Sequence, residues 1–383
     1  RYAVWFTPLT IVVCVGVYVL TGEWLRVLAV LVVATPCPLI LATPVAIVGG
    51  INRAARRQIV VRHGGALERL GAVTTAVFDK TGTLTIGKPR VQSVRATAAF
   101  TTSEVLRFAA AVERGSSHLL ARVIIEEAER QPGGLPLPQA TGYRESPGQG
   151  VVGDVQGRAV LVGSRAFVLG HCDANASEVA DLEGSAVILR AFVAIGGHLA
   201  GVIEYADELR SDAPALLASL RRVGITHTLL VSGDHTPNAR SIASLAGITE
   251  VHGDLSAGDK AAMVRRLMRN GEVVMMVGDG TNDAPALSSA DVGVALASQG
   301  AGISAEAADV IVLVDELDRV GDAVAIGHRT MRIARESILV GLGLSGAAMV
   351  AAALGYVPPT VGAVLQEAID VAVIVNALRT SRS

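Results

Sequence analysis

The sequence predicts a multi-pass α-helical membrane region that carries a water-soluble α/β head with an inserted α+β domain. Three observations lead to this prediction. The 383 residues are 51% hydrophobic and have a mean hydropathy of +0.48, which is too apolar for an ordinary soluble protein. Apolar runs of membrane-spanning length lie near the two ends of the chain. Between them, strand-like runs that end in Gly/Asp turns alternate with helical stretches, which is typical of a parallel, doubly wound sheet.

Composition and charge exclude several classes of protein. The formal net charge of −2 at pH 7 and the lack of a Lys/Arg tract argue against a nucleic-acid-binding protein, so no nucleic-acid partner is expected. Cys14, Cys37 and Cys172 stand at unrelated spacings, which fit neither a disulfide framework nor a metal finger. The first residues, RYAVWFTPLT, show neither an initiator Met nor the pattern of a signal peptide. We therefore expect the chain to be part of a longer one.

Four apolar runs are long enough to cross a membrane, because about 20 apolar residues span the hydrocarbon core. They cover roughly residues 4–20, 25–48, 336–354 and 359–378, in membrane segments over 1–63 and 326–383. Arginines gather where these segments meet the head, so the positive-inside rule places the head in the cytoplasm. We expect an integral protein of the cell (plasma) membrane, with the lipid bilayer as a partner. The arginines are Arg53, Arg56, Arg57, Arg62, Arg329, Arg332 and Arg335.

The head is predicted to be an α/β domain that a second domain interrupts. The runs VTTAVFDKTGT, HTLLVSGDH and EVVMMVGDGTND each combine a buried strand with an aspartate near its carboxyl end. Sheets of this kind bind ligands beyond the carboxyl ends of their strands. We expect this sheet over 64–92 and 206–325. Residues 93–205 break the pattern with Gly/Pro-rich turns and short β-like runs, and are expected to form the inserted α+β domain.

The strand ends carry the groups that phosphoryl transfer needs: a nucleophile, ligands for Mg²⁺, and a cation or donors for the phosphate oxygens. Asp79 directly follows an apolar strand, and a carboxylate can accept a phosphoryl group as an aspartyl-phosphate. Asp279 and Asp283 lie in a glycine-rich turn and offer the hard oxygen ligands that Mg²⁺ prefers. Ser232 and Lys260 would supply a hydroxyl and a positive charge to the transferred phosphate.

The motifs DKTGTLT and GDGTNDAPAL resemble those of the P-type ATPases, whose phosphorylation domain has the haloacid-dehalogenase-like fold. The resemblance implies that ATP phosphorylates Asp79, and that Lys80 and Thr81 belong to the catalytic group. It also implies that Thr81 and Asp279 help Asp79 to hold Mg²⁺. Soluble phosphatases of this fold usually carry an aspartate at the position of Thr81. A threonine cannot activate water as an aspartate can, so the acyl phosphate is expected to be long-lived. Asp207, in ADELRSDA, matches a family segment at the hinge between head domains.

The inserted domain resembles the nucleotide-binding domain of the heavy-metal branch of this family. That branch holds adenine with an S-E-H-P segment and a glutamate five residues before its histidine. Here ERGSSHLLA supplies the glutamate and the histidine at that spacing, while Ser117 and Leu119 replace the second glutamate and the proline. The segments GQGVVG and VGSR match the glycine loop and the next contact of the branch. The resemblance therefore implies that ATP is bound by Glu113, His118, Gly148, Gly150, Gly163 and Arg165.

The run VVATPCPLILATPVAIVGG contains three prolines, and each proline costs about 3 kcal/mol inside a helix. Broken helices are tolerated within a membrane where the freed backbone groups line an ion path. The segment TPCP resembles the C-P-C or S-P-C signature of heavy-metal pumps, which implies that Cys37 binds the transported cation. Acidic residues in membrane helices are costly and usually functional, so Glu367 and Asp370 are predicted to join it. One thiol with carboxylates favours a divalent ion such as Zn²⁺, Co²⁺ or Fe²⁺ over Cu(I).

The sequence therefore predicts an ATP-driven heavy-metal cation transporter that uses ATP and Mg²⁺. Two alternatives stay open: a membrane-tethered haloacid-dehalogenase-like phosphatase, and a non-transporting remnant that only binds nucleotide. Thr81 argues against the first, and the intact acidic and basic groups at the strand ends argue against the second. The resemblance also implies a missing N-terminal half, with an actuator domain and further helices, as the partner of this chain.

Overall fold

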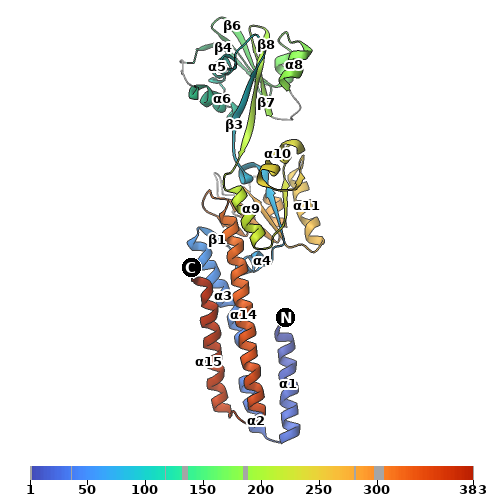
Figure 1. Ribbon diagram of the computed structural model, residues 1–383, viewed down its shortest axis with the longest axis vertical. Helices are drawn as coiled ribbons and strands as arrows, with labels where there is room; N and C mark the ends of the chain where they lie inside the picture. The colour runs from blue at the N-terminus through green and yellow to red at the C-terminus, as the bar shows by residue number, and fades with distance from the viewer. Residues whose placement is uncertain are drawn as a thin grey trace.

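The computed structural model describes residues 2–35, 37–116, 118–131, 137–183, 189–279, 282–296 and 306–382. Three parts follow one another along the long axis of the molecule (Figure 1). A bundle of long helices forms one end, a domain built on a mainly parallel sheet lies in the middle, and an antiparallel domain forms the other end. This order confirms the predicted combination of helical membrane region, α/β head and inserted domain.

The helical bundle contains both ends of the chain. Its helices are α1 (Tyr2–Thr21), α2 (Trp24–Val33), α3 (Cys37–Arg56), α14 (Arg319–Ala353) and α15 (Pro359–Ala377), with a 3₁₀ helix, η2 (Leu378–Ser381), after the last. Among the described residues, two helical segments are long and apolar enough to cross a membrane, Arg319–Ala353 and Pro359–Ser381. The predicted continuous run over 25–48 is instead divided into α2 and α3.

The division between α2 and α3 has a local cause. Helix α2 ends at Val33, and α3 begins at Cys37. Thr35 precedes a proline in the sequence, and a residue before proline is disfavoured in the helical conformation. Pro36 itself lies outside the described residues. A helix break at this point leaves backbone groups without helical partners, which places an irregular segment beside the thiol of Cys37.

Close contacts hold α3 against its neighbours. A Cβ atom added to Gly50 would lie 2.5 Å from Thr330 Oγ1 and 2.6 Å from Leu67 Cδ2, and one added to Gly49 would overlap Thr380 Oγ1. Only glycine leaves room for this approach. Helix α3 therefore packs directly on α14 and η2, and through Leu67 on the middle domain.

The middle domain is a seven-stranded sheet with strand order β1-β13-β12-β11-β2-β9-β10. All neighbours are parallel except β1, which is antiparallel to β13. The central strands are buried along their whole length, as expected for a sheet with helices on both faces. The elements are β1 (Ile59–Val61), α4 (Gly64–Leu70), β2 (Thr75–Asp79), α9 (Ala213–Arg222), β9 (His227–Val231), α10 (Thr236–Ala246), β10 (Glu250–His252), α11 (Ala257–Arg269), β11 (Val274–Gly278), α12 (Ala284–Ser289), β12 (Val292–Leu296) and β13 (Val310–Val312).

The inserted domain is a six-stranded antiparallel sheet with strand order β3-β8-β7-β6-β5-β4. A core that includes Phe108, Ile124 and Tyr205 lies between this sheet and helices α5 and α6. The elements are β3 (Thr85–Ala96), α5 (Thr102–Glu113), α6 (Leu119–Arg130), β4 (Ala140–Ser146), β5 (Gly150–Val155), β6 (Arg158–Gly163), α7 (Arg165–Leu169), α8 (Ala176–Glu183), β7 (Leu189–Ile195) and β8 (His198–Leu209).

Strands β3 and β8 are also the two connections between the head domains (Figure 1). They pair from Thr85↔Leu209 to Ala96↔Gly201. The predicted limits of the inserted domain, 93 and 205, therefore fall inside these strands, and the antiparallel sheet spans 85–209. The sequence placed the limits too far inward because the connecting strands are continuous with the sheet, so no composition change marks where the linker ends.

The middle domain is joined to the bundle without an intervening linker. Helix α14 has 35 residues and begins at Arg319, within the range predicted for the head. A Cβ atom on Gly327 of α14 would lie 2.8 Å from the backbone nitrogen of Gly71, at the end of α4. Arg57, just beyond α3, forms an ion pair with Asp322 of α14. The predicted boundary at 326 thus falls inside one continuous helix.

Candidate functional site

Asp79 lies at the carboxyl edge of the middle sheet. It is the last residue of β2, which pairs with β9 on one side and β11 on the other. Ser232 follows β9 and Asp279 follows β11. The carboxyl ends of neighbouring parallel strands meet at one edge of a sheet, so these three predicted site residues are brought together as expected.

Lys260 lies between two carboxylates at this edge. Its Nζ is 2.6 Å from Asp79 Oδ1 and 2.7 Å from Asp283 Oδ1, and all three side chains are buried. Lys260 stands in the first turn of α11, which begins with a reciprocal capping box between Ser256 and Asp259. This capping fixes the start of the helix and thereby the position of the ammonium group.

The electrostatics of the group depend on burial and on the number of carboxylates. Burial, followed by the charge of Asp283, raises the pKa of Asp79 to about 7, while Lys260 opposes this rise. Burial would lower the pKa of Lys260, but Asp79 and Asp283 outweigh it and raise that pKa. Lys260 therefore stays charged, and a second cation nearby would stabilise the ionised form of Asp79.

The loop after Asp79 turns sharply back over the strand ends. Gly82 has a φ of +71°, and a Cβ atom there would lie 2.7 Å from Asp279 Oδ2, so a glycine is required on both grounds. Thr81 is exposed beside it. Lys80 is buried and forms an ion pair with Asp234, a residue that sequence reasoning did not select although it lies in the VSGDH run.

The donor types at this edge suit a divalent cation, although the described residues hold no group of three His, Cys, Asp or Glu side chains placed to bind one. The carboxylates of Asp79 and Asp283 contact the ammonium group of Lys260, and Asp279 and Asp283 both add to the rise in the pKa of Asp79. Hard oxygen ligands with an excess of negative charge are what Mg²⁺ prefers. Asp79, Asp279 and the hydroxyl of exposed Thr81 are the predicted ligands. Gly280 and Thr281, in the same turn, lie outside the described residues.

Asp207 lies where the two connecting strands enter the inserted domain. It accepts hydrogen bonds from Thr85 Oγ1 and, at 3.1 Å, from the backbone nitrogen of Gly87. Burial raises the pKa of Asp207, although these hydrogen bonds oppose the rise. One side chain thus ties β8 to the start of β3, at the hinge position that the sequence indicated.

In the inserted domain, Glu113 and His118 lie at facing helix ends. Glu113 is the last residue of α5 and is 8% exposed. His118 is exposed and caps the start of α6, with its Nδ1 3.2 Å from the backbone nitrogen of Leu120. The short connection between α5 and α6 therefore carries both predicted nucleotide contacts, one buried and one exposed. Ser117, between the helices, lies outside the described residues.

The predicted glycines lie on β5 and β6 of the same domain and in the turn before β5. Gly150 pairs with Gly163 across β5 and β6, and a Cβ atom on Gly163 would lie 2.6 Å from Gly150 Cα. Gly148 has a φ of +73° in the turn before β5 and has open space around its Cα. Arg165 begins α7 directly after β6. Glycine at 150 and 163 is therefore required by the close approach of the two strands and of Phe167.

The membrane bundle contains a buried polar chain next to the helix break. Gln366 Nε2 donates to Asp370 Oδ1 at 3.0 Å, and Ser345 Oγ donates to Gln366 Oε1 at 3.2 Å. The Cys37 side chain interacts with the Asp370 carboxyl. Thr35 Oγ1 is buried without a hydrogen-bond partner among the residues that the structure describes. Cys37, Asp370, Gln366 and Ser345 thus form a connected chain of one sulfur and several polar groups.

Glu367 is not part of this group. It is exposed on α15, while Gln366 and Asp370 are buried. Helical geometry explains the difference, because Gln366 and Asp370 are four residues apart and share a face, whereas Glu367 is turned about 100° from Gln366. The same spacing could have identified Gln366 from the sequence. Ser345 lies on another helix, so no spacing in the sequence could predict its contact with Gln366.

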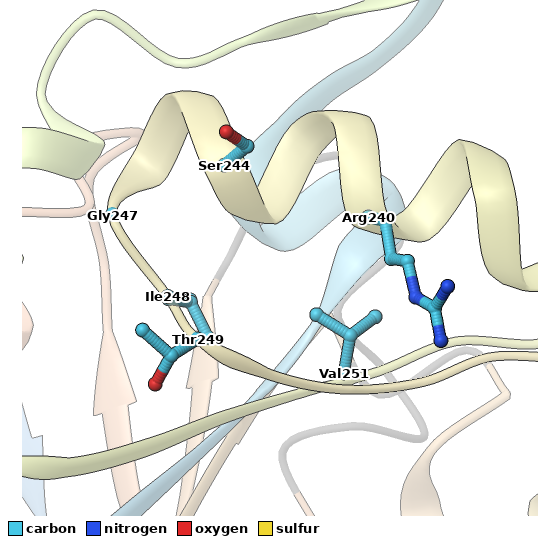
Figure 2. A pocket seen from close by; sticks show the side chains of 6 residues that line it. All are labelled: Arg240, Ser244, Gly247, Ile248, Thr249 and Val251. Carbon is cyan, nitrogen blue, oxygen red and sulfur yellow. The ribbon is translucent and has the colours of Figure 1, made fainter.

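A separate cavity lies away from the strand ends that carry Asp79. It has a volume of about 410 Å³, and α10 with the loop into β10 forms its walls (Figure 2). This loop leads to the amino end of β10, the opposite edge of the sheet from Asp79. Its lining includes none of the predicted site residues: Arg240, Ser244, Gly247, Ile248, Thr249 and Val251.

Comparison with known proteins adds a family match, two relatives and a solved structure. Residues 73–291 match the haloacid dehalogenase-like hydrolase family. The chain is 35% identical to a silver-exporting P-type ATPase of Salmonella typhimurium, over 98% of this chain and 47% of that protein. It is also 35% identical to a manganese-exporting P-type ATPase of Mycobacterium leprae, over 98% of this chain and 52% of that protein.

The solved structures include a zinc-transporting PIB-type ATPase in its E2·Pi state, with a TM-score of 0.88 and 33% identity. The match covers all of this chain and 63% of that one. The chain thus spans about half the length of the curated relatives that it matches.

Proposed function

Because the chain belongs to the haloacid dehalogenase-like hydrolase family, we propose that it is the phosphorylating and ion-binding portion of a heavy-metal P-type ATPase. The predicted resemblance to these pumps is confirmed by relatives that match 98% of the chain. The activity of a whole pump stays a proposal, since the chain spans about half of those relatives. We further place it in the cell membrane with the head in the cytoplasm, as its arginines indicate.

The observation that carries this proposal is the position of Asp79 against Lys260. The buried ammonium group lies 2.6 Å from the Asp79 carboxylate, where it holds the nucleophile and neutralises part of the charge of an incoming phosphate. An Asp79 oxygen attacks the terminal phosphorus of ATP, the bond to the bridging oxygen breaks, and ADP leaves. Mg²⁺ held by Asp79, Thr81 and Asp279 would spread the negative charge of the phosphate oxygens.

We assign ATP binding to the inserted domain. Glu113 ends α5 and His118 caps the start of α6, so a short connection joins them, and Gly150 and Gly163 pair closely on strands of the same domain. This supports a base-binding site of Glu113, His118, Gly148, Gly150, Gly163 and Arg165. Strands β3 and β8 connect that surface to Asp79.

We assign the transported ion to the helix break. Cys37 and Asp370 interact, and the buried hydroxyl of Thr35, which has no hydrogen-bond partner among the described residues, is a further oxygen donor. One sulfur with several oxygens favours a divalent ion such as Zn²⁺, Co²⁺ or Fe²⁺. Glu367, on the outer face of α15, is proposed to bind the ion on its way to Cys37 and Asp370. The relatives named above transport silver, manganese or zinc, so their names do not decide the ion.

The test of phosphoryl transfer is labelling of the purified chain with γ-labelled ATP and Mg²⁺. Wild type should give an acid-stable, hydroxylamine-labile label, and Asp79→Asn should give none, because an amide is no nucleophile. Asp318→Asn, a matched change at an exposed aspartate at the start of α14, should label like wild type. Label that persists in Asp79→Asn would refute the assignment.

The same preparation separates the alternatives. Rapid turnover of simple phosphomonoesters by wild type would favour the membrane-tethered phosphatase. ATP binding without any label would favour a remnant that only binds nucleotide. For the ion, Co²⁺ spectra should show mixed sulfur and oxygen ligation that Cys37→Ser abolishes, and ligation by sulfur alone would contradict a divalent ion.

A further inference from the structure

A groove with a volume of about 400 Å³ lies between α14 and α15. Both of its helices belong to segments that are long and apolar enough to cross a membrane, so the groove is part of the membrane region. It contains none of the residues assigned above to ATP, Mg²⁺ or the transported ion. The lining residues that give it its chemical character are Glu336, Ser337, Val340, Leu344, Asn376 and Arg379.

A chain of hydrogen bonds holds a guanidinium group at one end of the groove. Asn376 Nδ2 donates to Ser337 Oγ at 2.8 Å, and Arg379 Nη1 donates to Asn376 Oδ1 at 2.9 Å. Ser337 is 1% exposed, so the chain starts from a fixed point on α14. This contact uses one of the five N–H donors of a guanidinium group. Arg379 is therefore positioned while most of its donors stay available to a ligand.

An acid lines the groove together with Arg379. Glu336 is exposed, and among the described residues the ion pairs of α14 involve Arg319 and Asp322 and not Glu336. Glu336 and Arg379 thus line one cavity without forming an ion pair with each other. This leaves room between them for a ligand that carries one negative and one positive charge.

The depth of the groove in the membrane places these charges at the lipid headgroups. The hydrocarbon core takes about 20 residues of a helix. Counted back from Ala353, where α14 ends, its inner boundary falls within one turn of Glu336. Val340 and Leu344 follow Glu336 at spacings of four residues, on the same face and deeper in the membrane, and both are exposed. The groove thus offers charges at headgroup depth and apolar surface below them.

We propose that this groove binds one phospholipid with a zwitterionic, primary-amine headgroup, phosphatidylethanolamine. Its phosphate accepts hydrogen bonds from Arg379, its ammonium group donates to Glu336, and an acyl chain lies along Val340 and Leu344. The inference is independent of the proposed ATP and ion sites and rests on the membrane location of α14 and α15.

Charge complementarity selects this headgroup over other common ones. Basic pockets between membrane helices are typical of sites for anionic lipids, but here Glu336 repels additional negative charge. Phosphatidylglycerol has a phosphate and no amine, so it leaves Glu336 unpaired. Phosphatidylcholine has a quaternary ammonium group without an N–H to donate. Only a primary amine satisfies Glu336 with a charge-assisted hydrogen bond.

The test is titration of the purified chain in detergent with phosphatidylethanolamine, phosphatidylcholine and phosphatidylglycerol that carry identical acyl chains. Native mass spectrometry counts the bound lipid. Phosphatidylethanolamine should bind with one molecule per chain and about tenfold more tightly than the other two, as expected for a hydrogen bond to a charged group. Equal affinity for all three lipids would overturn the proposal.

Two variants test the two contacts separately. Glu336→Gln should lower the affinity for phosphatidylethanolamine to that for phosphatidylcholine, and phosphatidylglycerol should bind as well as before or better. Arg379→Gln should weaken the binding of all three lipids, because each has a phosphate. The matched control is Arg335→Gln, a change at an exposed arginine next to Glu336 that does not line the groove. It should leave all three affinities unchanged.

Melting without added lipid separates a lost contact from a lost fold. Glu336→Gln should melt like wild type, because Glu336 is exposed and has no ion pair among the described residues. A preference for phosphatidylethanolamine that persists in this variant would overturn the assignment of the headgroup. Particles of two chains without bound lipid would show that a second copy covers the groove, which would overturn the proposal as a whole.

Discussion

We propose that Thr81 is the residue whose chemistry separates storage of a phosphate from its hydrolysis. It stands two positions after Asp79 and is exposed, so a side chain there reaches solvent next to the carboxylate. A hydroxyl of ordinary pKa cannot take a proton from water as a carboxylate can. Of the two other acids close to the nucleophile, Asp283 is buried against Lys260 and Asp279 is a proposed ligand of Mg²⁺. Phosphorylated Asp79 would therefore lack a general base within this loop.

The first prediction replaces this residue. Thr81→Asp should shorten the lifetime of phosphorylated Asp79 by about a hundredfold, the usual contribution of a positioned general base. The decay of labelled protein after a chase with unlabelled ATP measures the lifetime. Thr81→Asn introduces a side chain of the same shape as aspartate but without a basic carboxylate oxygen, so the decay should stay slow. Equally fast decay in both variants would show that the Thr81 hydroxyl shields the phosphate from water and that the aspartate does not act as a general base.

At the residue scale, sequence patterns predicted the site residues at the carboxyl ends of strands. They missed side chains that come into contact from elements far apart in the sequence. Asp79, Ser232 and Asp279 could be placed together because each follows a buried strand of one parallel sheet. The partner of Lys80, Asp234, is 154 positions away, and no local pattern links the two. Ser345 joins Gln366 from another helix in the same way. These contacts exist only once tertiary packing has set the distance.

Backbone contacts fix the relative positions of helices, and the closest such contact described above joins the end of α4 to α14. Gly327 of α14 approaches Gly71 so closely that a Cβ atom would lie 2.8 Å from the Gly71 nitrogen and 2.8 Å from Leu70 Cβ. Backbone atoms cannot move aside as a flexible side chain can. The middle domain and α14 are therefore held at a fixed separation.

The second prediction tests this contact. Gly327→Ala should lower the free energy of unfolding by about 1–3 kcal/mol, the usual cost of overpacking, measured by thermal melting in detergent. Gly343→Ala makes the same change in the same helix, where nothing lies within 4 Å of the added atom. That control should be neutral or stabilising by up to about 1 kcal/mol, because alanine favours a helix. Equal melting of both variants would contradict the close contact.

The amino edge of the middle sheet carries a histidine and two acids, on the opposite side from Asp79. His227, the first residue of β9, lies 2.9 Å from both Glu250 and Glu272. Glu250 also contacts His252 at 3.0 Å. The hydrogen bond to Glu250 is the main cause that raises the pKa of His227. The bonds from His252 and His227 lower the pKa of Glu250.

The third prediction concerns pH. A raised histidine pKa stabilises the folded state below the ordinary value of 6.5, and this contribution is lost as pH rises through the folded pKa. The lowered Glu250 pKa stabilises above 4.5 and loses its effect as pH falls through the folded pKa. The cluster should therefore stabilise most between these values. His227→Gln should melt lower there and should flatten the fall in melting temperature toward alkaline pH.

The matched control is His198→Gln, a change at an exposed histidine of the inserted domain. It should leave the pH dependence of melting unchanged. The contributions of partly exposed groups are screened by solvent, so the comparison uses the difference between variants and not the absolute curve. A His227→Gln curve parallel to that of wild type would contradict a role for the cluster.

At the scale of the whole molecule, periodicity and turn chemistry predicted both head domains and the terminal helices. The exact limits of the inserted domain and of the membrane segments could not be predicted, because β3, β8 and α14 each continue across a boundary. A strand or helix that serves two domains keeps one periodicity throughout. The break after α2 was indicated by proline, whose effect on the backbone is local.

The fourth prediction concerns turnover by this 383-residue chain expressed by itself. Asp79, Lys260 and the proposed nucleotide surface should suffice to form the phosphoenzyme. Its breakdown should be slow, because Thr81 is no base. A time course should show consumption of roughly one phosphate per chain, as for a covalent intermediate that accumulates, followed by slow leakage. Steady turnover stimulated by metal ions would show that a residue of this chain activates water.

The unbroken course of α14 has a mechanical consequence. At 1.5 Å per residue, its 35 residues make a rod about 50 Å long, of which the hydrocarbon core takes about 30 Å. The remaining length is clamped to the middle domain at Gly71. A rod with one clamped end acts as a lever: a tilt of about 5° displaces its far end by about 4 Å. Ser345, 18 residues beyond Gly327 and hydrogen-bonded to Gln366, would move by about 2 Å at the same tilt if α15 stayed in place.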